Sequence, residues 1–168
     1  YSYPSMTTMW NQLALVKGAA IVVLNPANGP GTGVDPVYTE ALGALQAPGT
    51  HDEIDIYGYV DTDSGGRSAD EVLADVIRYV EWYRPEGIFL DQTPSQVETV
   101  PYLLSISDQI RQQGLKVAMN PGQPEFDARL MDAADYIVNF EGPADAYEAT
   151  RFPSWARERS SKFWHLVY

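Results

Sequence analysis

The sequence predicts an α/β fold of the (β/α) TIM-type barrel class, with parallel strands inside and helices outside. Short apolar runs rich in β-branched residues recur along the chain, most are followed by a helix-like stretch, and almost every run ends in a polar residue. A complete barrel takes roughly 250 residues, whereas this chain has 168. We therefore expect a single barrel domain over residues 1–168 that lacks the last βα unit.

Six apolar runs are predicted as strands, and a seventh strand is predicted at the start of the chain. They begin about 20 to 35 residues apart, which is the length of a βα unit. The six are Ala20–Asn25, Ile54–Asp61, Gly87–Asp91, Lys116–Asn120, Tyr136–Glu141 and Phe163–Tyr168, and the seventh is Tyr1–Tyr3.

The polar residues that end these runs distinguish a barrel from an open, doubly wound sheet. An open sheet gathers its polar residues in one crevice, whereas a barrel brings one from nearly every strand to the same rim. Here five runs end this way, at Asn25, Asp61, Asp91, Asn120 and Glu141. The pattern favours a barrel.

Capping signals predict the helices between the strands. Ser68 to Glu71 and Ser95 to Glu98 each have the Ser-x-x-Glu pattern of a capping box. Apolar residues follow both boxes at helical spacing, and Gly114 is placed to end the second helix. Shorter helices are predicted at Trp10–Lys17 and Pro153–Arg159.

The composition restricts the classes of partner. The 11 basic and 23 acidic residues give a net charge of −12, so the chain lacks the positive field that nucleic acid or an anionic membrane requires. The longest apolar run, Ala19 to Leu24, is far shorter than the roughly 18 to 20 residues of a membrane span. The chain starts at Tyr1 without a basic-then-apolar leader, so we expect a trimmed or mature form.

Several cofactor and metal motifs are excluded. Cysteine is absent, which removes disulfides, thiolate metal sites and cysteine nucleophiles. The glycines of Gly29 to Val34 do not match a dinucleotide-binding loop, and Asp61 to Gly65 lacks the ligands of a calcium loop. His51 and His165 have no second histidine at ligand spacing. We therefore expect neither a metal nor a cofactor.

Asp91 and Glu141 are the first candidates for catalysis, because both end strand-like runs at the rim where barrels hold their catalytic groups. Their strands are two apart, so the rim positions begin roughly 10 Å apart and converging side chains close this to about 5 to 7 Å. Carboxyls about 5 Å apart serve a retaining glycosidase, and wider pairs serve an inverting one. On spacing alone, a helix cap and a loop salt bridge are the alternative roles.

Six segments resemble the spherulin-4 family, and they occur in the family's order. They are Tyr3-Pro4-Ser5, Asn25 to Gly31, Tyr57 to Thr62 with Arg67, Gly87 to Asp91, Asn120-Pro121-Gly122 and Phe140-Glu141. The family is grouped as glycoside hydrolase family 135 and has a (β/α)8 barrel. The resemblance implies a secreted or cell-surface enzyme that cleaves α-1,4-linked N-acetylgalactosamine and galactosamine internally, in biofilm polysaccharides such as galactosaminogalactan.

The resemblance also assigns residues. The family's strand-four acidic pair falls on Asp91 and Gln92, and its strand-six glutamate falls on Glu141. Gln92 departs from the family's Asp-Glu, and an amide can neither donate nor accept a catalytic proton. If Asp91 is the nucleophile and Glu141 the acid/base, Gln92 only orients substrate. If position 92 carries the acid/base, this chain is a disabled relative that binds carbohydrate, whether the glutamine is natural or introduced.

Other polar and aromatic residues near the strand ends suit a sugar site, because aromatic faces stack on pyranose rings while polar edges form hydrogen bonds. The residues predicted to bind substrate are Tyr3, Asn25, Tyr57, Tyr59, Asp61, Asn120, Trp164 and His165. Core packing is the alternative for each aromatic residue. An acidic cleft would attract a partly deacetylated, cationic polymer, although solubility explains the charge equally well.

Overall fold

The computed structural model describes residues 8–13, 18–47 and 54–168. One sheet of six parallel strands runs in the order β1-β2-β3-β4-β5-β6. The strands are β1 (Ala20–Leu24), β2 (Ile54–Asp61), β3 (Gly87–Asp91), β4 (Lys116–Met119), β5 (Tyr136–Gly142) and β6 (Phe163–Val167). Each agrees with a predicted run, so the predicted βα order is confirmed. The strand predicted at Tyr1–Tyr3 lies outside the described residues.

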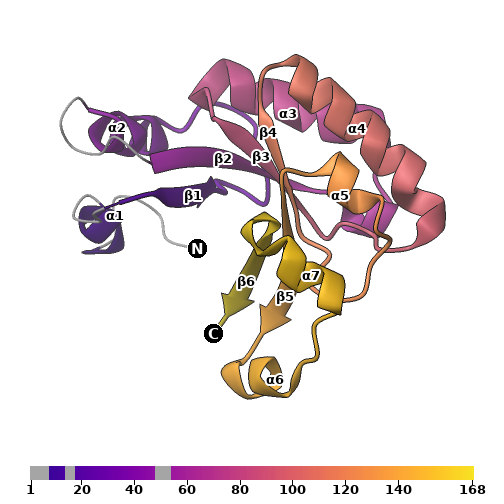
Figure 1. The fold of residues 1–168 in the computed structure, drawn as a ribbon. Helices are drawn as coiled ribbons and strands as arrows, with labels where there is room; N and C mark the ends of the chain where they lie inside the picture. The colour runs from indigo at the N-terminus through magenta and orange to yellow at the C-terminus, as the bar shows by residue number, and fades with distance from the viewer. Residues whose placement is uncertain (1–7, 14–17, 48–53) are drawn as a thin grey trace.

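The sheet curls into a half-barrel with helices on its outer side (Figure 1). Every strand pairs with its neighbour in sequence, and in the described part β1 and β6 are the two edges of the sheet. Parallel neighbours require a crossover connection, which the helices supply. A register shift between Val138 and Phe140 disturbs the pairing of β5 with β6. The predicted TIM-type architecture is thus confirmed as a curled, six-stranded half-barrel.

Helices predicted by capping and periodicity are present, and others were not predicted. The described helices are α1 (Thr8–Leu13), α2 (Pro36–Leu45), α3 (Ala69–Tyr83), α4 (Val100–Gln112), α5 (Leu130–Ala133), α6 (Ala144–Ala149) and α7 (Ser154–Glu158). The sequence patterns anticipated α1, α3, α4 and α7. They missed α2, which begins where the Asp35 carboxylate accepts a 2.9 Å hydrogen bond from the Val37 N–H and Pro36 takes the first position.

The two predicted capping boxes have different outcomes. Ser68 caps α3: its hydroxyl accepts from the Glu71 N–H, and the Glu71 carboxylate accepts from the Ser68 N–H. The box at Ser95 is wrong, because a 3-10 turn (Val97–Thr99) intervenes and Ser95 Oγ instead accepts from Gln123 Nε2 at 2.6 Å. A helix that began at Ser95 would carry Pro101 inside it, where proline lacks the required N–H. α4 instead starts at Val100 and takes Pro101 in its first turn.

The inner strands β2 to β5 bury both faces, and alternate residues enter two different cores. On β2, Ile56 and Val60 belong to the outer core beneath the helices, whereas Tyr57 and Tyr59 belong to an aromatic inner cluster. Gly58 faces outward, where a Cβ atom would lie 2.5 Å from the Tyr79 ring of α3. This close contact sets α3 against β2. No described helix is long and apolar enough to cross a membrane.

Candidate active site

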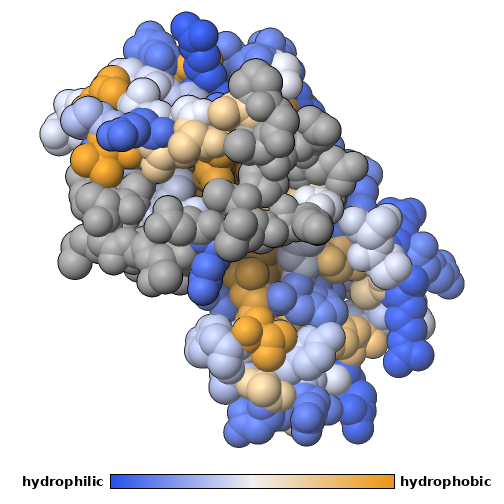
Figure 2. All heavy atoms as spheres, turned by 90° about the vertical axis from the view of Figure 1, so that its left-hand side faces the viewer, coloured by the Kyte–Doolittle hydropathy of each residue, from blue (hydrophilic) through white to orange (hydrophobic). Residues whose placement is uncertain are grey.

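A pocket of about 900 Å³ lies along the concave inner face of the half-barrel. It extends from polar residues at the carboxyl ends of the strands to Asp55 and Ala20 near their starts. Its walls are mostly apolar, and Figure 2 shows apolar surface bordered by hydrophilic residues on the face turned to the viewer. The lining residues are Ala19, Ala20, Ile21, Val23, Asp55, Tyr59, Phe89, Asp91, Asn120, Tyr136, Glu141, Trp164 and Leu166.

The two predicted catalytic carboxylates meet at the rim of this pocket. Asp91 is the last residue of β3 and Glu141 lies near the end of β5, with Asn120 between them directly after β4. Asn120 Nδ2 donates to Asp91 Oδ1 at 2.8 Å and to Glu141 Oε2 at 2.6 Å. Both bonds start from one nitrogen, so the distance between the two carboxylate oxygens cannot exceed the sum of the two bond lengths, about 5.4 Å.

A second donor orients Asp91. The Tyr59 hydroxyl donates to Asp91 Oδ2 at 2.7 Å. Each oxygen of this carboxylate therefore accepts one hydrogen bond, Oδ2 from Tyr59 on β2 and Oδ1 from Asn120 directly after β4. Tyr59 lies two residues before the end of β2, on the same face as Asp61, which pairs with Asp91 in the sheet register. Glu141 is more exposed than Asp91. Asp91 is therefore held firmly, whereas Glu141 is open to water.

Gln92 lies beside this pair but its side chain contacts Asp61. Its backbone is left-handed, with φ of 49°, a conformation that non-glycine residues rarely adopt. Gln92 Nε2 donates to Asp61 Oδ2 at 3.3 Å, and Asn28 Nδ2 donates to the same oxygen at 3.3 Å. The Asp63 N–H donates to the other oxygen, Asp61 Oδ1, at 2.7 Å. Asp61 and Gln92 thus form a rim group next to the pocket, outside its lining residues.

The carboxyl groups at the rim have no cationic side-chain partner in the described part of the chain. None of the ion pairs in the described part of the chain involves Asp61, Asp91 or Glu141. Their hydrogen-bond donors are neutral amides, a phenol and a main-chain N–H. Such a site attracts neutral hydroxyls or cationic groups and repels anions. No group of three or more histidines or acids in the described ranges could hold a metal ion.

Four aromatic rings line the wall of the pocket below the carboxylates. Tyr59 stacks on Phe89 with centroids 6.3 Å apart, and Phe89 stacks on Trp164 at 6.5 Å. Trp164 in turn stacks on Tyr136 at 4.8 Å. Trp164 and Tyr59, which the sequence pattern selected for sugar binding, therefore belong to one continuous aromatic wall. Stacked rings of this kind suit the apolar faces of pyranoses.

Tyr57 is buried beneath that wall and does not line the pocket. Its ring meets Trp164 edge to face with centroids 6.0 Å apart, and it covers Gly87, which leaves no room there for a Cβ atom. Burial raises the pKa of the Tyr57 hydroxyl, and the nearby Tyr136 and Asp55 raise it further. The sequence leaves two roles open for Tyr57, sugar binding and core packing, and its buried position is that of a core residue.

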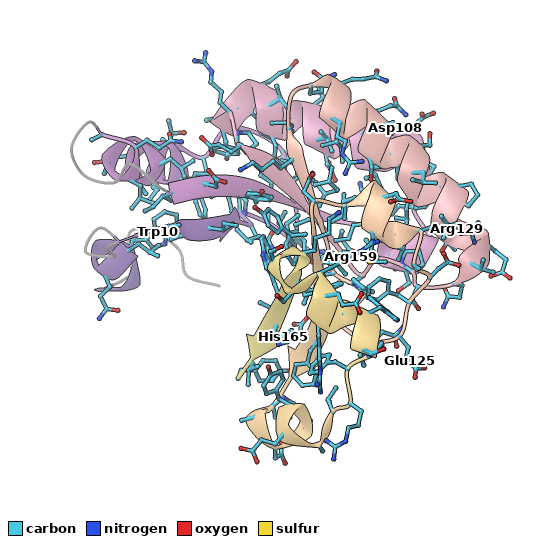
Figure 3. The ribbon with its side chains drawn as sticks, in the orientation of Figure 1. Trp10, Asp108, Glu125, Arg129, Arg159 and His165 are labelled. Atoms are coloured by element: carbon cyan, nitrogen blue, oxygen red, sulfur yellow. The ribbon has the colours of Figure 1, made fainter. Side chains whose placement is uncertain are left out.

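His165 faces away from the pocket. It follows Trp164 directly on β6, and adjacent residues of a strand point to opposite faces. The His165 ring stacks on Phe152 at 4.6 Å, and its Nδ1 shares a 2.8 Å hydrogen bond with the Tyr147 hydroxyl. Figure 3 labels it on β6. Burial lowers the pKa of His165. The residue belongs to an outer aromatic cluster with Phe140, and not to the candidate site.

Asn25, another predicted sugar-binding residue, is not among the described residues that line the pocket. Asn25 Oδ1 accepts a 2.9 Å hydrogen bond from the Gly29 N–H, which closes the loop after β1 on itself. Asn25 therefore shapes the loop that carries Asn28. Tyr3 lies outside the described residues.

Sequence reasoning missed several residues of the pocket wall. They are Ala19, Ala20, Ile21, Val23, Asp55, Phe89, Tyr136 and Leu166. The period of two along a strand could have found some of them. Phe89 lies two residues before Asp91 and Leu166 two residues after Trp164, so each shares a face with a residue already selected.

Comparisons with known proteins agree with this architecture. The family model of spherulation-specific family 4, Spherulin4, matches residues 1–168. Spherulin-4 of Physarum polycephalum is 30% identical in an alignment of 165 positions that covers 94% of this chain and 47% of that protein. The chain thus spans about half the length of this curated relative.

Two solved structures share the fold. The crystal structure of Aspergillus clavatus Sph3 in complex with GalNAc has a TM-score of 0.79 and 24% identity, and the match covers 99% of this chain and 74% of that one. The C-terminal domain of a putative chitinase from Desulfitobacterium hafniense DCB-2 has a TM-score of 0.58 and 12% identity, covering 80% of this chain and 51% of that one. With a family model that matches throughout and a half-barrel that superposes on Sph3, the chain belongs to the spherulation-specific family 4, the Spherulin-4 family.

Proposed function

We propose that this chain is a retaining glycoside hydrolase that cleaves α-1,4-linked N-acetylgalactosamine and galactosamine within an extracellular polysaccharide. The observation that carries the proposal is the shared donor of the acid pair. Asn120 Nδ2 bonds to both Asp91 and Glu141 and keeps their nearest oxygens within about 5.4 Å. Retaining glycosidases hold their two carboxyls about 5 to 5.5 Å apart, whereas inverting enzymes need about 6.5 to 9.5 Å to admit a water.

The hydrogen bonds favour Asp91 as the nucleophile. Two donors fix its carboxylate, Tyr59 on one oxygen and Asn120 on the other, and a fixed carboxylate suits in-line attack on the anomeric carbon. Glu141 is exposed and has one side-chain donor, so it can exchange protons with water as an acid/base.

The reaction proceeds in two displacements. Glu141 protonates the glycosidic oxygen while Asp91 attacks the anomeric carbon, which releases the first half of the chain and forms a glycosyl ester on Asp91. Glu141, now ionised, then removes a proton from a water that attacks the same carbon and frees Asp91.

Three features support an amino sugar polymer as the substrate. The aromatic wall of Tyr59, Phe89 and Trp164 offers stacking surface. The carboxylates of Asp61 and Asp91, which no ion pair of the described residues involves, favour the ammonium of a deacetylated residue. The structural neighbour Sph3 was crystallised with GalNAc. A polymer of this kind lies outside cells, which fits a secreted or cell-surface protein.

A carbohydrate-binding relative without activity is the second candidate, and Gln92 is the observation that favours it. The spherulin-4 resemblance places a glutamate at this position, and an amide cannot transfer a proton. The geometry favours the hydrolase, because the Gln92 side chain contacts Asp61 and the Asp91–Glu141 pair is complete without it.

Product analysis separates the two candidates. The unmodified protein, Gln92→Glu, Asp91→Asn and the surface control Gln113→Glu are each incubated with partly deacetylated α-1,4-galactosamine polymer, and the products are measured by mass spectrometry. We expect shortened oligosaccharides from all but Asp91→Asn. Products from Gln92→Glu alone would place the essential acid at 92 and establish the binding relative. Products from none of the four would overturn the hydrolase for this substrate.

A further inference from the structure

Arg67, on the loop between β2 and α3, connects the rim of the pocket to the helices behind it. One guanidinium nitrogen donates to the main-chain oxygen of Asp61 at 2.6 Å. The other donates to the Glu71 main-chain oxygen at 3.0 Å and to Asp75 Oδ2 at 2.7 Å. The main-chain oxygen of Arg67 itself accepts a 2.8 Å hydrogen bond from the Tyr102 hydroxyl of α4. Arg67 therefore joins β2, α3 and α4 at a single point.

Asp75, the acidic partner of Arg67, is buried behind the rim loops. Only 8% of the residue is exposed, and its second oxygen pairs with Arg78 at 2.6 Å. It also lies against the loop after β1, because a Cβ atom on Gly29 would be 3.7 Å from Asp75 Oδ2. The residue before Gly29 is Asn28, which donates to the Asp61 carboxylate. Arg67 and Asp75 thus support both loops that meet at Asp61.

We propose that Arg67 is a positioning residue that fixes the carboxylate of Asp61, and with it Gln92, at the pocket rim. This inference rests on the proposed function, in which the rim receives the sugar chain. The guanidinium binds the main-chain oxygen of Asp61 and not its carboxylate. Arg67 therefore orients Asp61 without neutralising it, and the negative charge remains available to a hydroxyl or ammonium group of the ligand.

Two features of these contacts favour an arginine at position 67. The planar guanidinium reaches three acceptors, Asp61 from one nitrogen and both Glu71 and Asp75 from the other. A lysine ammonium on a flexible stem would keep the charge but could not match this fork. The Arg67 side chain is only 26% exposed, whereas Arg78 is 46% exposed and bonds to the other oxygen of Asp75, three residues along α3. Arg78 is therefore a matched control.

The side-chain amides of Asn28 and Gln92 report the position of Asp61 without any ligand, since both donate to its carboxylate. Their signals are compared by NMR in the unmodified protein, Arg67→Lys, Arg67→Gln and Arg78→Gln. We expect both amide pairs to shift in the two Arg67 variants and to stay in place in Arg78→Gln. Unchanged signals in Arg67→Lys, or equal shifts in Arg78→Gln, would overturn the proposal. If Arg67→Gln does not fold, Arg67→Lys decides.

Ligand binding tests whether the effect passes through Asp61. The dissociation constant of an α-1,4-galactosamine oligosaccharide is measured by calorimetry for Arg67→Lys, Asp61→Ala and the double variant. We expect about tenfold weaker binding for Arg67→Lys, and no further loss when it is added to Asp61→Ala, because the group it positions is gone. Additive losses would overturn the proposal. If the unmodified protein binds no oligosaccharide, the proposed function fails, and the NMR comparison alone decides the role of Arg67.

Discussion

Tyr59 and Asp91, on the neighbouring strands β2 and β3, are joined by a 2.7 Å hydrogen bond from the phenol to carboxylate Oδ2. We expect Tyr59→Phe to keep the ring in the aromatic wall and to lose this bond. A hydrogen bond to a charged group contributes about 1.5 to 3 kcal/mol, so kcat/KM should fall about tenfold to a hundredfold. Initial-rate assays on the galactosamine polymer measure the change. Tyr136→Phe, which removes another hydroxyl from the same pocket, is the control, and an equal loss there would contradict a specific role for Tyr59.

The distance between the carboxyl groups of Asp91 and Glu141 predicts the stereochemistry of cleavage. Because Asn120 Nδ2 bonds to both Asp91 and Glu141, their bonded oxygens lie within about 5.4 Å, closer than the roughly 6.5 to 9.5 Å of inverting enzymes. We expect the first product to keep the α configuration of the substrate. Proton NMR of the anomeric signals, recorded before mutarotation, checks this. A β product would show that the two carboxylates separate when substrate binds and that the single-displacement route is used.

Gly58 is predicted to be intolerant of a side chain. A Cβ atom there would lie 2.5 Å from the buried Tyr79 ring, so Gly58→Ala should lower the free energy of unfolding by about 1 to 3 kcal/mol through overpacking. Gly43, inside α2, has nothing within 4 Å of such an atom, and Gly43→Ala should raise the stability by about 0.5 to 1 kcal/mol. Urea denaturation of both variants measures the two changes. Similar effects at the two sites would contradict the close contact.

The carboxyl ends of the strands could be predicted from sequence because burial determines both the apolar run and the point where it ends. A buried parallel strand is a short apolar run, and its carboxyl end meets solvent at the rim, so a polar residue marks the boundary. Asp91 and Glu141 could be placed in this way from the sequence alone. Asn120 was selected as a sugar-binding residue, but its role as the shared donor depends on side-chain directions that spacing alone does not determine.

Other features depended on contacts that sequence patterns do not encode. Trp164 and His165 are adjacent, so the period of two requires that only one of them faces the pocket, but it does not determine which one. For Gln92, the side-chain direction follows from a left-handed backbone with φ of 49°, which glutamine gives no reason to expect. The core position of Tyr57 follows from its depth along β2, because Tyr59 shares its face but lies closer to the rim.

The two predicted capping boxes provide a paired test of helix stability. Ser68→Ala removes a side chain that accepts from the Glu71 N–H at the start of α3, and loss of a serine cap costs on the order of 1 kcal/mol. Ser95→Ala removes only a 2.6 Å hydrogen bond on the surface, from Gln123, and should change stability by less than about 0.5 kcal/mol. Thermal unfolding of the two variants measures the difference. Equal destabilisation would imply that Ser95 also caps a helix.

His165 should make the stability of the fold depend on pH. Burial lowers its pKa below the ordinary value of 6.5, so the unfolded chain takes up the proton at a higher pH than the folded chain. The stabilisation is therefore complete above about pH 6.5 and is lost as the pH falls through the folded-state pKa. We expect the melting temperature of the unmodified protein to fall relative to that of His165→Gln as the pH is lowered from about 7.5 to about 5.5. His51 is present in both proteins and cancels from the difference. Because His165 lies on the opposite face of β6 from the pocket, the substitution should leave kcat/KM unchanged, and a loss of activity would show that this histidine does influence the site.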